Sequence, residues 1–402
     1  MTRASIREPS PARPSAVVPM SALAIAGIVL VALNMRTAVA EIPPVLPDLG
    51  LSNAAQSVLA TVPVICFGLA ALGAPALRTR LGEERGLLLA LVALLVGVVL
   101  RAAWPEHVGL FGGTVLAGCA IAVMNVLVPS LVRRRCPGRV GLMMGVYTTA
   151  LVSGGSLAAA TTVPLRDAAD GSLHIALGIW AVPIVVGIVA WLPQRGHRAL
   201  PAVAGGREAI RALGRSPIAW YVTAFMGLQS LLYFAPLSWL PAIHRDQGID
   251  PATAGVLLST MNLVSIPTTF LAPVLAHRMR DQRKAVAGCV ALTAIGLSGV
   301  LLAPSSTALV WVVIMGLGQG AALSLALLMI VLRAEDDHTA ARLSSMAQGF
   351  GYLLAAAGPL VMGLLHAATG DWDVPLVVLI GLCAAELWAG LAAGRARVVH
   401  AG

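Results

Sequence analysis

The chain of 402 residues is long enough for two or three soluble domains, but 58% of its residues are hydrophobic and only 11% are charged, with a mean hydropathy of +0.86. That composition excludes an ordinary soluble multi-domain enzyme. The formal charge of +9 would suit a nucleic-acid-binding protein, yet 27 basic residues in so apolar a chain form a phosphate-binding surface only if they cluster.

Apolar stretches recur along the whole chain, and each is long enough to cross a hydrocarbon core of ~30 Å as a helix of ~20 residues. In chain order they are Met20–Leu46, Ala55–Leu77, Gly86–Trp104, Gly109–Val132, Val140–Pro164, His174–Leu192, Pro217–Leu240, Ala252–Ala276, Ala285–Ala303, Thr307–Leu332, Leu343–His366 and Val374–Gly394. They predict an all-α membrane protein with twelve transmembrane helices.

A polar segment divides these twelve stretches into six and six. The predicted organisation is a cytosolic tail (1–19), a first six-helix half (20–192), a cytosolic linker (193–216), a second six-helix half (217–394) and a cytosolic tail (395–402). The five cysteines are widely spaced and odd in number, which predicts buried thiols rather than a disulfide framework or a metal site.

Basic residues give the orientation, because Lys and Arg in short loops are retained on the cytoplasmic side. With the N-terminus inside, 23 of the 27 basic residues fall on the cytoplasmic side. Arg101, Arg166 and Arg245 fall in outer loops, and Arg36 alone lies within a span. The pattern predicts a multi-pass membrane protein with both termini in the cytoplasm, and it accounts for the net charge without nucleic acid.

The two halves repeat each other in sequence. An offset of 198 residues aligns Pro75 with Pro273 and Arg80 with Arg278, and an offset of 203 aligns Gly155 with Gly358. Two parallel six-helix repeats joined by a cytosolic linker are typical of secondary transporters, whose substrate site lies near the bilayer midplane between the repeats.

Four stretches carry a more specific likeness. They are Leu33–Ala38 leading to Pro44–Pro47, Asn125–Ser130, Pro137–Met143 continuing to Tyr147–Ala150, and Met346–Leu354 with Gly358 and Pro359. Together they resemble the bacterial cyanate and 2-nitroimidazole transporter family of the major facilitator superfamily. The resemblance implies two pseudo-symmetric halves (the major facilitator fold) and alternating-access transport, active or facilitative, of a small anionic or weakly polar solute. It also implies a location in the plasma membrane, the bacterial inner membrane. The basic loop after the second helix lacks the superfamily's usual acidic residue at Leu77.

Arg36 is the principal candidate for substrate binding. Burying a charged side chain in the middle of a membrane-spanning helix costs ~2.5–3.5 kcal/mol even on lenient insertion scales. The planar guanidinium of arginine is suited to binding an anion. The alternative is an arginine held by carbonyl and amide groups for packing alone. Polar side chains expected at similar depths complete the predicted site: Asn34, Asn125, Tyr147, Thr148, Gln229, Tyr233, Asn262, Gln319, Gln348 and Tyr352. Each could instead bond a neighbouring helix.

Glu41 is the candidate for proton coupling, although a solvated carboxylate at the end of the span is the competing interpretation. Glu386 lies on the last helix, which we expect to be peripheral. The acidic run Glu335–Asp337 is expected to be a solvated face.

The expected partners are the lipid bilayer, a small solute and, as a candidate coupling ion, the proton. We expect a monomer with no cofactor or metal and no enzymatic activity, because no catalytic constellation is present. A multidrug efflux pump of the same superfamily and a membrane-embedded enzyme are the alternatives. Intramembrane acids would favour the first, and acids or histidines clustered at a membrane surface the second.

Overall fold

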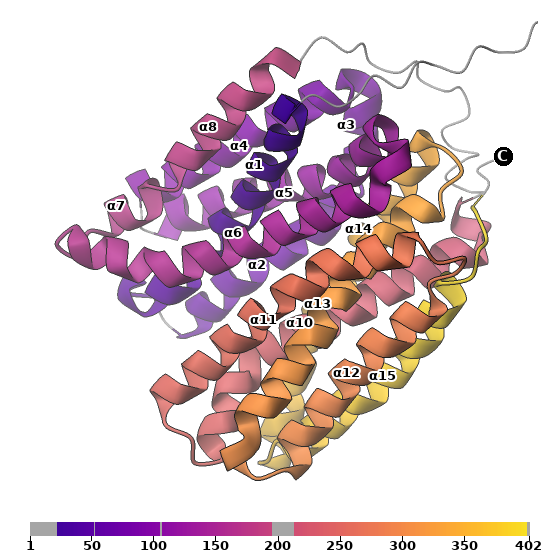
Figure 1. Cartoon of the computed structure of the whole chain (residues 1–402). Helices are drawn as coiled ribbons and strands as arrows, with labels where there is room; N and C mark the ends of the chain where they lie inside the picture. The colour runs from indigo at the N-terminus through magenta and orange to yellow at the C-terminus, as the bar shows by residue number, and fades with distance from the viewer. Residues whose placement is uncertain (1–21, 52, 105–106, 195–212, 400–402) are drawn as a thin grey trace, which may run out of the picture.

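The computed structural model describes residues 22–51, 53–104, 107–194 and 213–399 (Figure 1). The predicted N-terminal tail, most of the predicted linker and the last three residues of the C-terminal tail lie outside these ranges.

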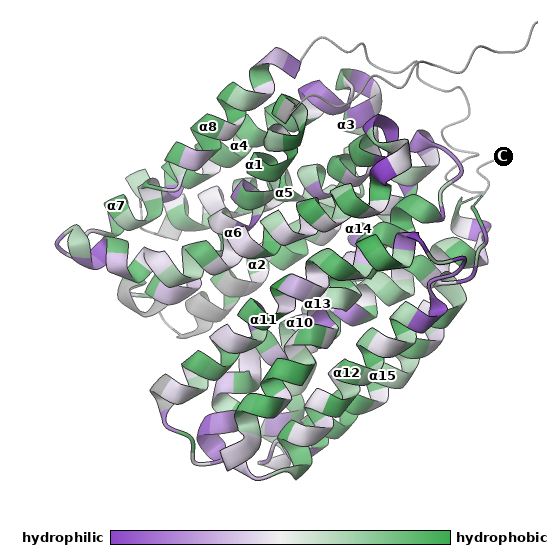
Figure 2. Ribbon diagram, viewed as in Figure 1, coloured by the Kyte–Doolittle hydropathy of each residue, from purple (hydrophilic) through white to green (hydrophobic). Residues whose placement is uncertain are grey.

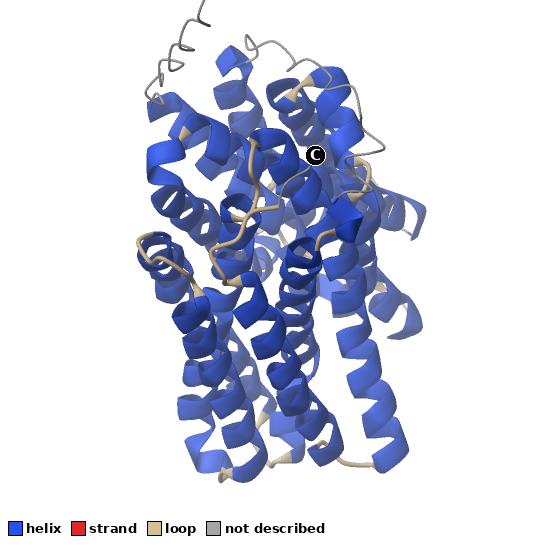
Figure 3. Cartoon of the chain, turned by 90° about the vertical axis from the view of Figure 1, so that its right-hand side faces the viewer, coloured by secondary structure: helices blue, strands red, loops and turns tan. Residues whose placement is uncertain are grey.

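The described chain is built from α-helices, and Figure 3 draws no strand in it. The helices before the linker are α1 (Ala22–Ala40), α2 (Asn53–Ala71), α3 (Ala74–Leu81), α4 (Glu83–Ala103), α5 (His107–Arg135), α6 (Val140–Ala168), α7 (Leu173–Gly178) and α8 (Ala181–Trp191). Those after it are α10 (Pro217–Asp246), α11 (Pro251–His277), α12 (Arg283–Leu302), α13 (Ala308–Leu332), α14 (Asp337–Thr369) and α15 (Asp373–Ala393).

Eleven described helical segments are long and apolar enough to span a membrane, or twelve if a bent pair is counted as one span. The bent pair is the second predicted span, where the end of α2 (Thr61–Ala71) and α3 meet at 54°. Gly73 lies at the break and Pro75 in the first turn of α3. Proline has no N–H to donate and clashes with the preceding turn, so a continuous helix is broken here. Large apolar side chains such as Val99, Leu263 and Leu364 are exposed, and hydrophobic residues predominate along the helices (Figure 2), as expected for a bundle that faces lipid.

Equivalent helices pack in the same pairs on both sides of the linker. Helix α1 packs on α6 as α10 packs on α14, and α4 packs on α5 as α12 packs on α13. Glycine permits the first of these pairs: a Cβ at Gly154 would lie 2.4 Å from the carbonyl oxygen of Leu33, and one at Gly358 would lie 3.0 Å from the side chain of Leu231. The repeat read from the sequence therefore has a counterpart in helix packing.

The halves meet along two long seams, α2 with α14 and α6 with α11. Polar bonds cross between them: the Ser345 hydroxyl donates to the Ala71 carbonyl (2.6 Å), the Gln348 amide to the Asn125 carbonyl (2.8 Å), and the Thr148 hydroxyl to the Thr269 carbonyl (3.2 Å). We call these three contacts the central seam.

Charged residues gather at one end of the molecule, which we call the linker end because residues 194 and 213, on either side of the linker, lie there (upper right in Figure 2). Helix α14 begins at this end with Asp337, two turns before the predicted start of its span. Asp336 accepts a hydrogen bond from the Thr339 backbone N–H (2.7 Å) and so caps the helix.

Candidate functional site

Arg36 lies on α1 where it packs against α6, its Cβ 3.5 Å from the position of a Cβ on Gly155. The side chain is half-buried and makes no hydrogen bond or ion pair with any residue in the described part of the chain. Its charge acts electrostatically on the phenol groups of Tyr147, Tyr233 and Tyr352. These tyrosines belong to α6, α10 and α14, so Arg36 faces residues of both halves.

Three of the chain's four tyrosines are therefore within electrostatic range of Arg36. The Tyr147 hydroxyl donates to Asn125 Oδ1 (3.2 Å) and the Tyr233 hydroxyl to Asn262 Oδ1 (2.8 Å). The Tyr352 ring meets Phe67 of α2 edge-on at 5.5 Å, and its hydroxyl makes no hydrogen bond with a described residue. We call Arg36, the three tyrosines, Asn125 and Asn262 the central cluster.

Two further predicted site residues lie in the seam between the halves. Gln348 is fully buried and donates to the Asn125 carbonyl and to the Ser344 hydroxyl (2.8 Å each). Thr148 is also fully buried and bonds the Thr269 carbonyl across the interface. Both residues close the interface beside the central cluster, in the state that the structure represents.

Three other predicted site residues are held by backbone carbonyls, outside the central cluster. Asn34 is fully buried and donates to the Pro183 carbonyl on α8 (2.9 Å). Gln229 donates to the Met226 carbonyl within α10 (3.1 Å), and Gln319 to the Leu232 carbonyl (2.8 Å). In this state they tie turns and helices together within one half.

Glu41 corrects the expectation of a solvated carboxylate. Its side chain is fully buried, and its Oε1 lies 2.6 Å from Nη2 of Arg101, which is 1% exposed. The same nitrogen donates to the Ala38 carbonyl (2.9 Å). The placement of Arg101 in an outer loop was therefore wrong as well: the guanidinium turns inward from the end of α4 and neutralises a carboxylate that would otherwise be buried alone.

Glu386 on α15 is likewise buried, with both carboxylate oxygens lacking a hydrogen-bond partner among the described residues. A peripheral last helix would leave Glu386 facing outward, but its side chain points into the protein. The groups on which its charge acts, Cys289 and Cys383, belong to the same half. Glu386 thus lies inside the second half and away from Arg36.

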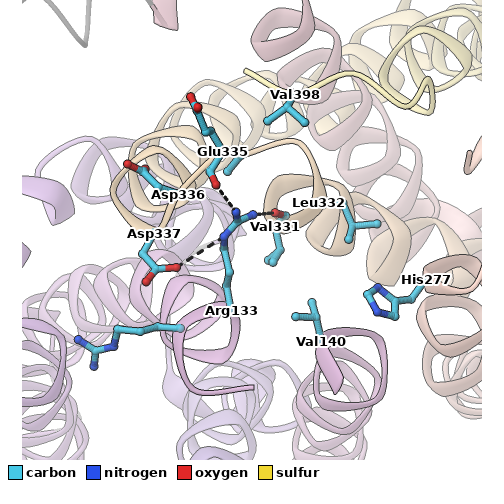
Figure 4. Close-up of a pocket in the computed structure, with 11 residues that line it drawn as sticks. Arg133, Val140, His277, Val331, Leu332, Glu335, Asp336, Asp337 and Val398 are labelled. Atoms are coloured by element: carbon cyan, nitrogen blue, oxygen red, sulfur yellow. Dashed lines mark hydrogen bonds and ion pairs between the residues drawn. The ribbon is translucent and has the colours of Figure 1, made fainter. Parts of the chain in front are cut away.

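The basic residues of the linker end do more than set orientation. Arg78 pairs with Glu83 (2.8 Å) and meets Nδ1 of His338 in the other half (3.1 Å). Arg133 of α5 donates to the carbonyls of Val331 and Glu335 and lies 3.5 Å from Asp337 (Figure 4). Within the acidic run, Glu335 and Asp336 are exposed, as expected of a solvated face, while Asp337 also pairs with Arg133.

A cavity of about 680 Å³ lies beside these contacts and includes His277 and Val398 in its lining (Figure 4). It is bounded by residues of both halves at the linker end. Sequence reasoning missed this closure, because the arginines were explained by topology alone. Among the residues described, no group of three or more His, Cys, Asp or Glu side chains could hold a metal ion.

Comparison with known proteins agrees with this architecture. A sequence profile of the Major Facilitator Superfamily matches residues 24–340 and 240–398. The chain is 36% identical over 382 residues to the 2-nitroimidazole transporter of Escherichia coli strain K12, covering 94% of this chain and 96% of that one. It is 30% identical over 363 residues to the cyanate transport protein CynX of the same organism, covering 88% and 94%. Among solved structures, the proton:xylose symporter XylE matches with a TM-score of 0.76 at 12% identity, over 93% of this chain and 96% of that chain.

Proposed function

This chain belongs to the major facilitator superfamily, and from that premise we propose that it carries a small anionic or weakly polar solute, resembling cyanate or a nitroimidazole, by alternating access. The predicted family, the all-helical fold and the assignment as a transporter rather than an enzyme are confirmed by the profile and the relatives. The observation that carries the proposed substrate class is Arg36, a half-buried cation in the first span whose charge acts on tyrosines of both halves and which has no hydrogen-bond or ion-pair partner among the described residues.

The energetic argument rests on the cost of an intramembrane charge, about 2.5–3.5 kcal/mol on lenient scales. Arg101 offsets that cost with Glu41 and the Ala38 carbonyl. Arg36 has no carboxylate or carbonyl partner among the described residues, so a substrate anion would supply the compensating negative charge. A guanidinium can give two parallel N–H bonds to the two oxygens of a carboxylate or nitro group, and it can donate to one end of the linear cyanate ion.

The excess of basic residues at the linker end supports a cytoplasmic location for that end. In that orientation the contacts of Arg133 and Arg78 and the central seam close the cytoplasmic side, and the transported solute reaches Arg36 from the opposite side. Transport requires the central seam to break and a new closure to form on the outer side. We propose that both termini lie in the cytoplasm of a bacterial inner-membrane protein that works as a monomer.

Equilibrium binding to purified protein tests the proposed function. Cyanate, nitrite, benzoate and 2-nitroimidazole are titrated into the wild type and into Arg36→Ala, with the lipophilic cation tetraphenylphosphonium as the opposite charge. We expect at least one of the four solutes to bind the wild type and to lose most of its affinity in the variant. Binding of the cation with none of the four solutes would overturn the proposal and favour an efflux pump.

Coupling is tested separately in proteoliposomes. If Glu41 serves proton coupling, an imposed pH gradient changes the uptake of the bound solute, and Glu41→Gln abolishes that dependence. A pH-independent uptake in the wild type would remove Glu41 from the mechanism and identify facilitated transport.

A further inference from the structure

Charge is scarce around Arg36. In the middle of the described spans the only Asp, Glu, Lys, Arg or His side chains are Arg36 and Glu386, and Glu386 lies inside the second half. Glu41 and Arg101 neutralise each other and are sealed from solvent. A solute bound at Arg36 therefore meets one positive charge. A second negative charge on that solute would enter the low-dielectric interior unpaired, at a cost that no described group offsets.

Hydrogen-bond donors are equally scarce. The hydroxyls of Tyr147 and Tyr233 are already donated to Asn125 and Asn262. The Arg36 guanidinium, the Asn125 side-chain NH2 and the Tyr352 hydroxyl are the donors of the central cluster with no acceptor in the described chain, and of these only the Tyr352 hydroxyl belongs to the second half. Arg36 belongs to the first half and Tyr352 to the second, and the charge of the first acts on the phenol of the second.

The aromatic rings make this arrangement selective. Tyr147 and Tyr352 are almost fully buried, and Phe67 holds the Tyr352 ring from the first half. Apolar ring faces exclude water and strengthen the attraction between a guanidinium and a single negative charge. The same walls offer no solvation to a second charge.

We propose that the central cluster binds singly charged anions, held between Arg36 of one half and the Tyr352 hydroxyl of the other, and excludes dianions. This inference rests on the proposed function, since it presumes that Arg36 binds the transported solute. The bound anion would bridge the two halves, so occupancy of the site would favour the state in which α1 and α14 are close.

Matched ligands test the charge limit. Two pairs share size and shape but differ by one charge at pH 7.5: 4-nitrobenzoate with terephthalate, and methanesulfonate with sulfate. Each ligand is titrated alone and as a competitor of cyanate or 2-nitroimidazole, whichever binds. We expect a monoanion to bind at least tenfold more tightly than its dianionic partner. Equal affinity within a pair, or binding of 2-nitroimidazole with no monoanion, would overturn the inference while leaving the proposed function intact. Failure of every monoanion and of 2-nitroimidazole would instead defeat the proposed function.

Tyr352→Phe tests the bridge, because it removes the hydroxyl and keeps the ring against Phe67. We expect it to weaken monoanion binding about tenfold or more, as the loss of a hydrogen bond to a charged group does, with no change in melting temperature. Tyr221→Phe is the matched control, since Tyr221 is the one tyrosine outside the cluster and packs edge-on against Trp388 at 5.3 Å. Wild-type affinity in Tyr352→Phe, or an equal loss in Tyr221→Phe, would overturn the role of Tyr352.

Discussion

Two arginines in the membrane-spanning part of the first half have opposite surroundings. Arg101 is buried, with one nitrogen bound to both the Glu41 carboxylate and the Ala38 carbonyl. Arg36, five residues before Glu41, is half-buried and faces three tyrosines with no oxygen of the described chain bound to it. The difference separates an arginine that stabilises the fold from one that is available to a ligand. Each prediction below would break or sharpen that difference.

Arg101→Ala should have the largest effect on the protein. It leaves the Glu41 carboxylate buried without its cation, which typically costs about 3–5 kcal/mol of folding free energy. We expect a sharp fall in folded yield and in the melting temperature of purified protein. The double variant Glu41→Leu with Arg101→Met removes both charges and should recover most of the stability. A single variant as stable as the wild type would show that the pair does not hold α1 and α4 together.

Arg36→Ala should act on binding rather than folding. Hydrogen bonds to charged groups contribute ~1.5–3 kcal/mol, so we expect monoanion affinity to fall about 10- to 100-fold. The melting temperature without ligand should stay the same or rise, because an unpaired intramembrane charge is removed. Arg36→Lys should bind with intermediate affinity, since it keeps the charge but not the planar fork. A loss of stability equal to that of Arg101→Ala would make Arg36 a structural residue too.

Arg133→Gln should shift the balance between conformations by a smaller amount. The side chain joins the halves through the carbonyls of Val331 and Glu335 and through a partly exposed pair with Asp337, and such a pair is worth at most ~1 kcal/mol. We expect a several-fold increase in the population open at the linker end. Distances between spin labels at the exposed positions 139 and 280 would measure it.

Arg134→Gln is the matched control for that experiment. Arg134 is next to Arg133 in the sequence, but it pairs with Glu83 and Glu84 of its own half. The variant should therefore leave the distance distribution between the labels unchanged. An equal shift in both variants would mean that general loss of charge, rather than the bonds between halves, opens this end.

Glu386→Gln should have the smallest effect. Glu386 is the other ionisable residue in the middle of a described span, but the cysteines beside it belong to its own half. Glutamine keeps the shape of the side chain, so anion uptake and affinity should stay within about twofold of the wild type. Loss of uptake would show that the carboxyl group takes part in transport, and the contrast with Arg36 would then have to be redrawn.

The fold could be predicted from the sequence because its signals are local. The length of each apolar stretch identifies a span, and the basic residues in the loops indicate how the spans are oriented across the membrane. The site was predicted less completely, since depth along a span does not give direction around it. Asn34 and Arg36 are two residues apart, about 200° around a helix, so they cannot face the same neighbour. The structure turns Asn34 toward α8 and places Arg36 where α1 packs on α6.

Pairings between distant segments were not accessible from the sequence at all. Glu41 and Arg101 are separated by two helices, and nothing in their local sequence indicates that they meet. The same holds for Arg133 and the loop before α14. Arg36 could be singled out from the sequence because a single cation in an apolar span is conspicuous without knowledge of its neighbours.

The central claim is that Arg36 binds the charge of the solute, and a thermodynamic cycle tests it most directly. The affinities of 4-nitrobenzoate and its neutral isostere 4-nitrobenzamide are measured by calorimetry in the wild type and in Arg36→Ala. We predict a coupling free energy of at least about 1.5 kcal/mol between the guanidinium and the ligand's charge. Equal losses for the charged and neutral ligands would contradict the claim.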